Sequence, residues 1–409
     1  MSRSRLNPGR VAAIKALLAA ERGQNADEAL GKLAPADPAD RALAWNVALG
    51  VLRNRAALDA GITVAARRAV WTLDPPVLAI LRAAAFEMAF TRTPPHAAVD
   101  QAVELSRAAG VGHAAGLVNA VLRKVEVPRE GDAALGFPEW LVARWRAARG
   151  ADADVYMRAC ADPAEVHLVA RAPGADLAAE FAAAGRELHP VGAGVYRLPQ
   201  RAGRIEDLPG YAEGRWWVMD PAAVAVADLV PQVERVLDTC AAPGGKSLRL
   251  ASRGMRVTAT DADAERLERV RQNAARVGLP LETACVDWEQ AGLGRTFPAV
   301  LVDAPCTALG LVRRHPEIRW RRTEADIRKS AARQVRILAR AAASVAPGGV
   351  LVYAVCSPEP EEGPAVAATL GWPIEATFDN AANSTGADVF YACRMVNVAG
   401  RPAVGPGIG

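Results

Sequence analysis

The sequence predicts an α/β protein: a mostly parallel, doubly wound sheet in the C-terminal half, preceded by an all-helical domain and a small α+β linker domain. Apolar residues recur at helical spacing through the first 130 residues, and strand–loop–helix units repeat from about Val233 onwards. The helical stretch is basic, the stretch after it acidic, and the C-terminal part basic again. We therefore predict domains at 1–130, 131–220 and 221–397, and a disordered tail rich in Gly and Pro at 398–409.

The first domain is predicted to contain about five to seven helices. Val11, Ile14 and Leu17 place an apolar side chain every three to four residues, which is the helical period. The pairs Pro75-Pro76 and Pro94-Pro95 indicate the starts of later helices, because proline fits the first turn of a helix.

The linker domain and the sheet are predicted from shorter patterns. In the linker domain we expect a helix over Phe137–Gly150, a strand over Val166–Ala170, a helix over Leu177–Ala184 and a strand over Val195–Leu198. In the sheet we expect strands at Arg235–Asp238, Arg256–Thr260, Ala299–Val302 and Gly349–Val355, and helices at Ala264–Val277 and Ser330–Val345. Because the strands alternate with helices, they are expected to run parallel.

Composition excludes several classes of protein. Hydrophobic residues make up 51% of the chain and charged residues 23%, which argues against overall disorder. No apolar run reaches about 18 residues without a charge, and the N-terminus does not lead into a signal sequence. We therefore expect a cytoplasmic protein, without a membrane span and monomeric. Six cysteines without a C-x-x-C pair predict free thiols and no metal site.

A glycine-rich loop, Cys240-Ala-Ala-Pro-Gly-Gly-Lys-Ser247, follows the first predicted strand of the sheet and opens a helix. Glycines let the backbone approach a ligand, and a helix N-terminus favours an anionic group. The loop is neither a Walker A motif nor G-x-G-x-x-G, which excludes a nicotinamide-dependent dehydrogenase. Lys246 is one of only five lysines in the chain. A tight structural turn is the alternative interpretation.

Two carboxylates follow the next strands. Asp261 ends the second predicted strand, where an acid typically binds ribose hydroxyls. Asp287 follows a further hydrophobic stretch, where it could accept a hydrogen bond from an adenine amino group. Each acid alone would more often be a solvated loop residue. Their order at successive strand ends favours a cofactor that contains adenosine.

Two of the six cysteines lie at the carboxyl ends of neighbouring predicted strands. Asp303-Ala-Pro-Cys306 closes one strand, and Val355-Cys356 closes the next. Ligands of open α/β sheets bind at this edge. A single cysteine there would usually be a small buried side chain. The pair, with Asp303 beside it, indicates a reaction centre.

A basic stretch follows Cys306. Residues 313–340 carry a net charge of +7, whereas the whole chain carries only +4. Arginine binds phosphates and stacks on bases, and Trp320 adds an aromatic face. We therefore interpret this stretch as an RNA-binding surface, with a solvated arginine-rich helix as the alternative.

These motifs together resemble the RNA cytosine-C5 methyltransferases of the Nop2/Sun family. The resemblance covers residues 137–393 and rests on four segments in order: Cys240–Lys246, Asp303–Gly310, Arg313–Trp320 and Cys356–Glu362. It implies a Rossmann-like methyltransferase domain that uses S-adenosylmethionine (SAM). Met219, Val355 and Gly363 depart from the residues that are common in the family.

The helical segment is similar to a NusB-type RNA-binding domain, notably in Val99–Leu105 and Gly116–Lys124. This combination resembles the bacterial branch of the family that acts on small-subunit ribosomal RNA. The resemblance therefore implies RNA as the partner, with 16S ribosomal RNA as the substrate. A tRNA cytosine-C5 methyltransferase and a non-catalytic RNA-binding assembly factor stay open as alternatives.

The resemblance also implies a role for each site residue. The glycine-rich loop would hold the methionine portion of SAM, Asp261 the ribose and Asp287 the adenine. The predicted cofactor-binding residues are Cys240, Ala241, Ala242, Pro243, Gly244, Gly245, Lys246, Asp261, Arg266, Asp287 and Asp303. Cys356 would be the nucleophile, Cys306 would assist product release, and Asp303 would contact the target cytosine near N3.

Overall fold

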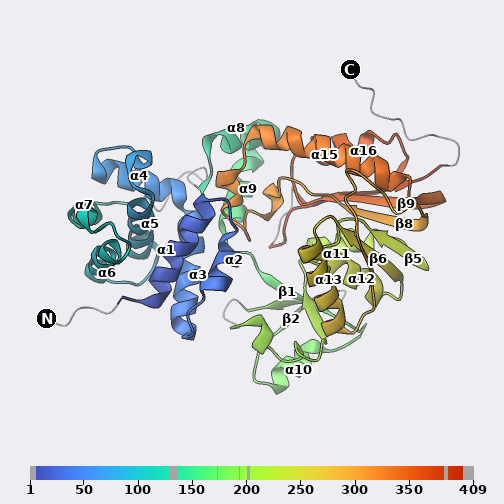
Figure 1. The fold of residues 1–409 in the computed structure, drawn as a ribbon, viewed down its shortest axis with the longest axis horizontal. Coiled ribbons are helices and arrows are strands. Elements are labelled where there is room, and N and C mark those ends of the chain that lie inside the picture. The colour runs from blue at the N-terminus through green and yellow to red at the C-terminus, as the bar shows by residue number, and fades with distance from the viewer. Residues whose placement is uncertain are drawn as a thin grey trace. The chain divides into compact units, whose positions relative to one another are not determined.

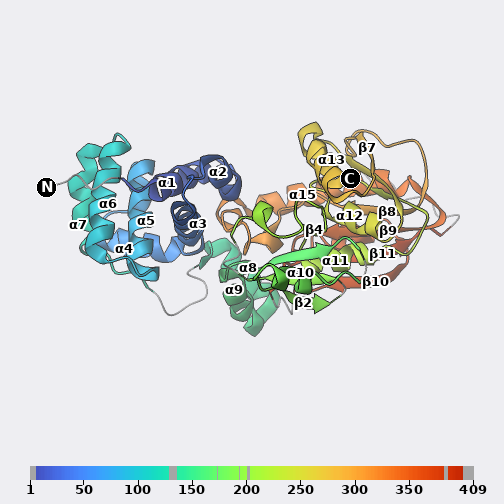
Figure 2. The same ribbon diagram turned by 90° about the horizontal axis from the view of Figure 1, so that it is seen from below.

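A computed structural model describes residues 6–128, 136–172, 174–192, 194–199, 203–381 and 386–398. Its contacts divide the chain into two compact units: Met1–Asp162 with Val312–Arg322, and Pro163–Leu311 with Thr323–Gly409. Figures 1 and 2 show the elements of both units. The three-domain division remains a prediction. Of the predicted tail at 398–409, only Val398 lies within the described residues.

The first unit is built from α-helices, and apolar residues of α1 to α7 form its core. The helices are α1 (Pro8–Glu21), α2 (Ala26–Leu33), α3 (Pro38–Arg53), α4 (Arg55–Ala66), α5 (Pro75–Phe90), α6 (Pro95–Ala108), α7 (Ala115–Leu122), α8 (Glu139–Arg149), α9 (Ala153–Ala161) and α14 (Ile318–Arg321). The predicted helix starts at Pro75 and Pro95 are confirmed. No helix in the described part of the chain is long and apolar enough to span a membrane.

A small antiparallel sheet opens the second unit, with strand order β2-β3-β1-β4. Its elements are β1 (Val166–Ala170), α10 (Leu177–Ala183), β2 (His189–Gly192), β3 (Val195–Leu198) and β4 (Trp216–Val218). Arg276 fastens this sheet to the rest of the unit by donating hydrogen bonds to the carbonyl oxygens of Tyr211 and Trp216, at 2.8 and 3.1 Å.

A seven-stranded sheet forms the centre of the second unit, with strand order β10-β11-β9-β8-β5-β6-β7. Its strands are β5 (Arg235–Asp238), β6 (Arg256–Asp261), β7 (Glu282–Cys285), β8 (Phe297–Asp303), β9 (Val345–Val355), β10 (Ile374–Asp379) and β11 (Tyr391–Val396). Strands β5 to β9 pair in parallel, as predicted, whereas β10 and β11 add an antiparallel edge.

Helices cover both faces of this sheet, as Figure 1 shows. They are α11 (Pro221–Asp228), α12 (Gly245–Ser252), α13 (Ala264–Val277), α15 (Glu324–Ala342) and α16 (Pro364–Ala368). Successive residues of a strand point to opposite faces. Val236 and Leu301 accordingly pack in the cluster of α11 to α13, whereas Leu237 and Val300 pack in that of α15 and α16. This is the doubly wound arrangement that the sequence predicts.

The long helix α15 differs from its prediction at both ends. It begins at Glu324 rather than at Ser330, because Thr323 and Asp326 form a reciprocal capping box at its N-terminus. It ends at Ala342, because Val345 pairs with Phe297 and so belongs to β9. Strands β2, β4, β10 and β11 had not been predicted, and β7 had been expected only as a hydrophobic stretch without bounds.

Candidate active site

The predicted site residues lie at the carboxyl-terminal ends of the parallel strands of the large sheet, in the order of those strands. We call this row of strand ends the sheet edge. Parallel strands end together, so neighbouring strands deliver their last residues to the same edge. From β9 to β7 the strand ends carry Cys356, then Asp303 with Cys306, the glycine-rich loop, Asp261 and Asp287. The loop follows β5, the strand at which the order reverses, which is where open α/β sheets bind ligands.

The glycine-rich loop turns sharply between β5 and α12. Gly244 has φ of +107°, a conformation that L side chains rarely adopt, and a Cβ there would lie 3.3 Å from the side chain of Val270. The backbone N–H of Ala241 donates to the carbonyl oxygen of Thr260 at 2.8 Å, which fixes the loop against β6. Glycine at position 244 therefore lets α12 begin close to α13.

Asp261 binds the loop itself. Its two carboxylate oxygens accept hydrogen bonds from the backbone N–H groups of Ala242 (3.2 Å) and Asp263 (3.1 Å). Arg266 donates to the carbonyl oxygen of Ala242 at 3.2 Å, and its guanidinium lies 3.6 Å from Asp261. The structure therefore brings Asp261, Arg266 and the loop together.

Asp287 lies at the end of the neighbouring strand. Its carboxylate accepts hydrogen bonds from the backbone N–H of Glu289 at 2.9 Å and the side chain of Gln290 at 2.8 Å. The backbone N–H of Val286 donates to the carbonyl oxygen of Asp261 at 3.0 Å, which joins the two strand ends. The two acids are therefore held at adjacent positions of the sheet edge.

Asp238, the last residue of β5, is an acidic residue that the sequence analysis did not select. It is fully buried, and Ser247 of α12 donates to its Oδ2 at 2.7 Å. Its Oδ1 is buried and accepts no hydrogen bond from the described residues. Burial raises the pKa of Asp238 to about 7. Its place directly before the glycine-rich loop was the available sequence signal.

Lys246 and Asp303 form a partly buried ion pair, with Nζ 2.6 Å from Oδ2. Burial alone would lower the pKa of Lys246, but the charge and hydrogen bond of Asp303 outweigh it, so that the net shift is upward. The ammonium also lies 4.9 Å from the centre of the Phe390 ring. The Lys246 ammonium group is therefore held charged and in position near the middle of the row of strand ends.

Cys306 and Cys356 are in direct contact, with 3.2 Å between their sulfur atoms. The hydrogen bond to Cys356 and, after it, burial raise the pKa of Cys306 well above its ordinary value. Cys306 therefore favours its neutral thiol form beside the sulfur of Cys356. A negative charge on Cys356 would in turn interact favourably with Lys246. Cys240, by contrast, has a pKa raised to about 12 by burial.

Glu362 holds the loops that carry both cysteines. It is fully buried, and its carboxylate accepts hydrogen bonds from the backbone and hydroxyl of Thr307 and from the hydroxyl of Ser357. Thr307 and Ser357 each directly follow one of the two cysteines. Gln334 of α15 adds a hydrogen bond to the same carboxylate at 3.2 Å. Glu362 lies at the end of the Cys356–Glu362 motif, but the sequence predicted no role for it.

The basic stretch after Cys306, predicted as an RNA-binding surface, contains an arginine that is not available to RNA. Residues 312–322 belong to the first unit. The Arg319 guanidinium is fully buried and donates to the carbonyl oxygens of Gly136, Cys160 and Val312. Trp320 donates to the carbonyl oxygen of Leu52. These side chains saturate buried backbone oxygens, so the interpretation is wrong for Arg319.

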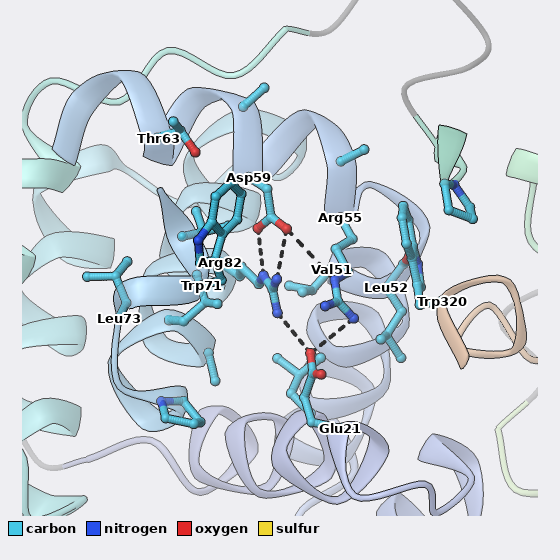
Figure 3. A pocket seen from close by; sticks show the side chains of 18 of the residues that line it. Glu21, Val51, Leu52, Arg55, Asp59, Thr63, Trp71, Leu73, Arg82 and Trp320 are labelled. Carbon is cyan, nitrogen blue, oxygen red and sulfur yellow. Dashed lines mark hydrogen bonds and ion pairs between the residues drawn. The ribbon is translucent and has the colours of Figure 1, made fainter. Parts of the chain in front are cut away.

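A cavity of about 610 Å³ lies in the first unit, between α1, α3, α4 and α5 (Figure 3). Arg82 makes two hydrogen bonds to Asp59, at 2.7 and 2.8 Å, and one to Glu21 at 2.9 Å. Arg55 lies 3.0 Å from the same Glu21. The two acids and two bases of this cluster thus neutralise one another.

Comparisons with known proteins agree with this arrangement. Residues 227–371 match the family described as 16S rRNA methyltransferase RsmB/F, and residues 7–127 match the NusB family. The ribosomal RNA small subunit methyltransferase B of Xanthomonas campestris is 39% identical over 78% of this chain and 77% of its own. The protein of the same name from Xylella fastidiosa is 33% identical over 85% and 86%.

Solved structures show the same fold. The crystal structure of PH0851 has a TM-score of 0.81 and 21% sequence identity, over 96% of this chain and 99% of its own. That of NSun6 from Pyrococcus horikoshii with SFG has a TM-score of 0.58 and 17% identity, over 64% and 98%.

Proposed function

We propose a specific chemistry for this chain, which belongs to the family of ribosomal RNA small subunit methyltransferase B: SAM-dependent methylation of a cytosine at C5 in 16S ribosomal RNA. The observation that carries the proposal is the contact between the Cys306 and Cys356 sulfur atoms, 3.2 Å apart, beside the Lys246–Asp303 ion pair. Together these groups offer a nucleophile, a second thiol, a carboxylate and a cation at one sheet edge.

The residues at the edge fit SAM. SAM supplies an electrophilic methyl group on a sulfonium ion, and its amino acid portion carries an ammonium group. Three carboxylates, those of Asp238, Asp261 and Asp303, outnumber the two nearby cations of Lys246 and Arg266, so the edge favours a further cation. The buried Oδ1 of Asp238 lacks a hydrogen-bond donor among the described residues, and an ammonium group could supply one. Asp261, Asp287 and Arg266 are placed for the adenosine portion.

Cys356 serves as the nucleophile in this proposal. Cytosine C5 is too weakly nucleophilic to take up a methyl group, but addition of the Cys356 thiolate to C6 makes C5 enamine-like. Lys246 favours the thiolate through its charge. Transfer of the methyl group to C5 would break the S–CH3 bond of SAM and leave S-adenosylhomocysteine, a neutral thioether. A base, such as water, would then remove the C5 proton, so that the C5–C6 double bond re-forms and Cys356 leaves as a thiolate. Cys306, whose sulfur lies against Cys356, would assist this elimination. Asp303 takes part in proton transfer at N3 of the cytosine, which neutralises the charge that develops there.

We propose RNA as the partner, with the helical unit as an additional RNA-binding element, and place the reaction in the bacterial cytoplasm where ribosomal RNA is made. The printed names of the relatives support a small-subunit ribosomal substrate. The target cytosine must leave its base stack to reach a sheet-edge pocket.

The two cysteines give the sharpest test. Cys356→Ala is expected to reduce methyl transfer from radiolabelled SAM to ribosomal RNA by on the order of 10⁴-fold or more, while SAM binding by calorimetry is retained. Cys306→Ser is expected to accumulate a covalent protein–RNA adduct that survives denaturing electrophoresis, because elimination is slowed. Full turnover by Cys356→Ala would exclude it as the nucleophile.

Bisulfite sequencing of total RNA tests the substrate. A strain that lacks the gene is expected to lose one methylated cytosine in 16S ribosomal RNA, and to regain it with wild type but not with Cys356→Ala. Loss from tRNA instead would contradict the ribosomal substrate. If no position changes and the purified protein does not bind SAM, the non-catalytic alternative holds.

A further inference from the structure

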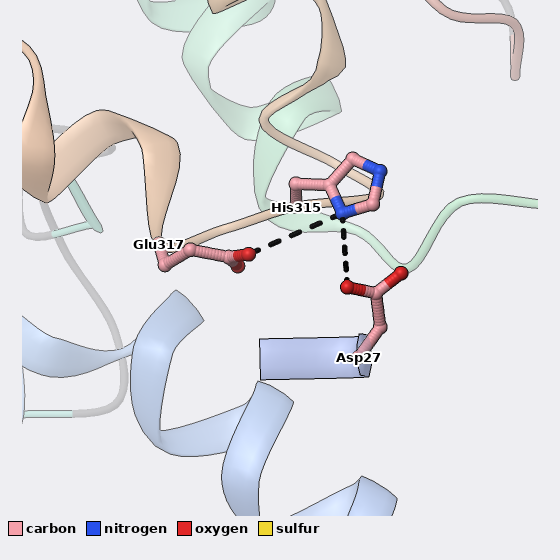
Figure 4. A group of neighbouring side chains, drawn as sticks. All are labelled: Asp27, His315 and Glu317. Atoms are coloured by element: carbon pink, nitrogen blue, oxygen red, sulfur yellow. Dashed lines mark ion pairs between the residues drawn. The ribbon is translucent and has the colours of Figure 1, made fainter. Parts of the chain in front are cut away.

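A second group of chemically reactive side chains lies in the first unit. Asp27, in the first turn of α2, faces His315 and Glu317 of the 312–322 segment (Figure 4). One ligand atom from each residue lies within 4.8 Å of the other two. Asp27 is far from the other two residues in the sequence, so no spacing motif revealed the group, and the sequence analysis expected no metal.

The distances between the His315 imidazole and the two carboxylates suit a metal ion lying between them better than direct hydrogen bonds. Nδ1 of His315 lies 3.7 Å from Oδ1 of Asp27 and 4.0 Å from Oε1 of Glu317. Both distances exceed the roughly 3.2 Å of a hydrogen bond. Both are shorter than about 4.2 Å, which is twice a zinc–nitrogen bond of about 2.1 Å. An ion between the atoms could therefore reach all of them with small side-chain adjustments.

Two of the atoms are also left unsatisfied. Nδ1 of His315 and Oε2 of Glu317 are buried and have no hydrogen-bond partner among the described residues. Glu317 is only 1% exposed, and its Oε1 accepts the backbone N–H of Ala26 at 3.1 Å. The guanidinium groups of Arg53 and Arg319 interact favourably with the Glu317 charge, but the buried Oε2 still lacks a direct partner among the described residues. A bound cation could supply one.

We propose that Asp27, His315 and Glu317 bind one divalent transition-metal ion, Zn²⁺ or a similar ion, with water completing its coordination. One imidazole and two carboxylates form a ligand set of nitrogen and oxygen that such ions accept. Glu317 lines a cavity of about 460 Å³, which gives the ion a path from solvent. The ion would tie the 312–322 segment to α2 and act structurally, apart from the cysteine chemistry.

Titration of tag-free, full-length protein with Co²⁺ tests the proposal. We expect one Co²⁺ per chain that Zn²⁺ displaces, seen in the visible absorption of the metal. The site should give no near-ultraviolet charge-transfer band, because that band reports thiolate ligands and would indicate binding by cysteines instead. His315→Ala is expected to weaken binding by about tenfold or more. Saturating Zn²⁺ should raise the melting temperature of wild type but not of this variant.

His113→Ala is the matched control, since Nε2 of His113 also lies 3.7 Å from a carboxylate, that of Asp74, but without a third ligand. It should bind Co²⁺ as wild type does. Glu317→Gln retains an acceptor for Ala26 and should lose the metal while remaining folded by circular dichroism. Equal affinity of wild type and His315→Ala, or binding only through thiolates, would overturn the proposal.

Discussion

Two clusters of charged side chains, one in each unit and both only partly buried, differ in their charge balance. Around Arg82, two acids and two bases pair completely, and the charges hold α1, α4 and α5 together. At the sheet edge, three carboxylates outnumber two cations: Asp303 pairs with Lys246, and Asp261 lies 3.6 Å from the Arg266 guanidinium. One carboxylate oxygen of the third acid, Asp238, has no partner among the described residues. The balanced cluster is complete without a ligand, whereas the unbalanced one needs a cation.

The largest expected effect breaks the balanced cluster. Arg82→Met leaves Asp59 and Glu21 short of a partner and should lower the free energy of unfolding by about 3 kcal/mol, measured by urea denaturation. Arg107→Met is the control, because the Arg107 side chain is 61% exposed and its pair with Glu104 should contribute under about 1 kcal/mol. SAM affinity of folded Arg82→Met should equal that of wild type; a weaker affinity would show that the clusters are coupled.

Lys246→Met tests the second cluster, the one at the sheet edge. Removing the only lysine of the edge leaves Asp303 without its 2.6 Å partner and Cys356 without a nearby cation. We expect kcat for methyl transfer to fall on the order of 100-fold, or about 2.7 kcal/mol. Stopped-time assays with radiolabelled SAM measure it. An unchanged kcat would remove Lys246 from the reaction.

Glu362→Gln tests whether the buried carboxylate positions the two cysteines. An amide cannot accept at both ends. Either the hydroxyls of Thr307 and Ser357, which share Oε2, or the Thr307 N–H and the Gln334 amide, which share Oε1, therefore lose their acceptor. We expect kcat to fall about tenfold while KM for SAM stays the same, because Glu362 lies on the cysteine side of the edge. Glu375→Gln, on the exposed strand β10, should have no effect. A raised KM with normal kcat would contradict the positioning role.

The smallest expected effect is the pH dependence of SAM affinity. Burial raises the pKa of Asp238 to about 7, so this carboxyl is largely protonated at pH 6 and ionised at pH 8. The added negative charge should strengthen binding of the cationic cofactor as pH rises, by about threefold. The ammonium group of SAM titrates nearby, so Asp238→Asn serves as the reference: its affinity should lack this increment. Identical pH profiles would exclude Asp238 as the source.

Local patterns predicted much of the fold. The strands Val166–Ala170, Val195–Leu198 and Arg235–Asp238 and the helix Ala264–Val277 have the predicted bounds. Each has either a short apolar core or a strong helical period, so its side chains alone specify it. Strand β10 carries no such pattern, because its residues alternate between exposed and half-buried at the sheet border. It is ordered by pairing with β11, which lies later in the chain.

The residues of the candidate site also divide into those that the sequence could predict and those that it could not. Cys306, Cys356, Lys246 and the acids at strand ends could be selected from the sequence, because parallel strands bring their carboxyl ends together. Glu362 could not, since its role depends on hydrogen bonds to two loops that carry the cysteines. Arg319 was misassigned because its buried partners, the carbonyl oxygens of Gly136 and Cys160, are distant in sequence.

The sequence by itself determined the α/β class of the second unit, the helical class of the first, and the order of the reactive groups along the sheet edge, since these follow from periodicity and strand order. Only the tertiary structure decided the contact between the two sulfur atoms, the unequal charge balance of the two clusters and the membership of 312–322 in the helical unit. Burial and distance between residues far apart in the chain set those properties, and no local pattern encodes them.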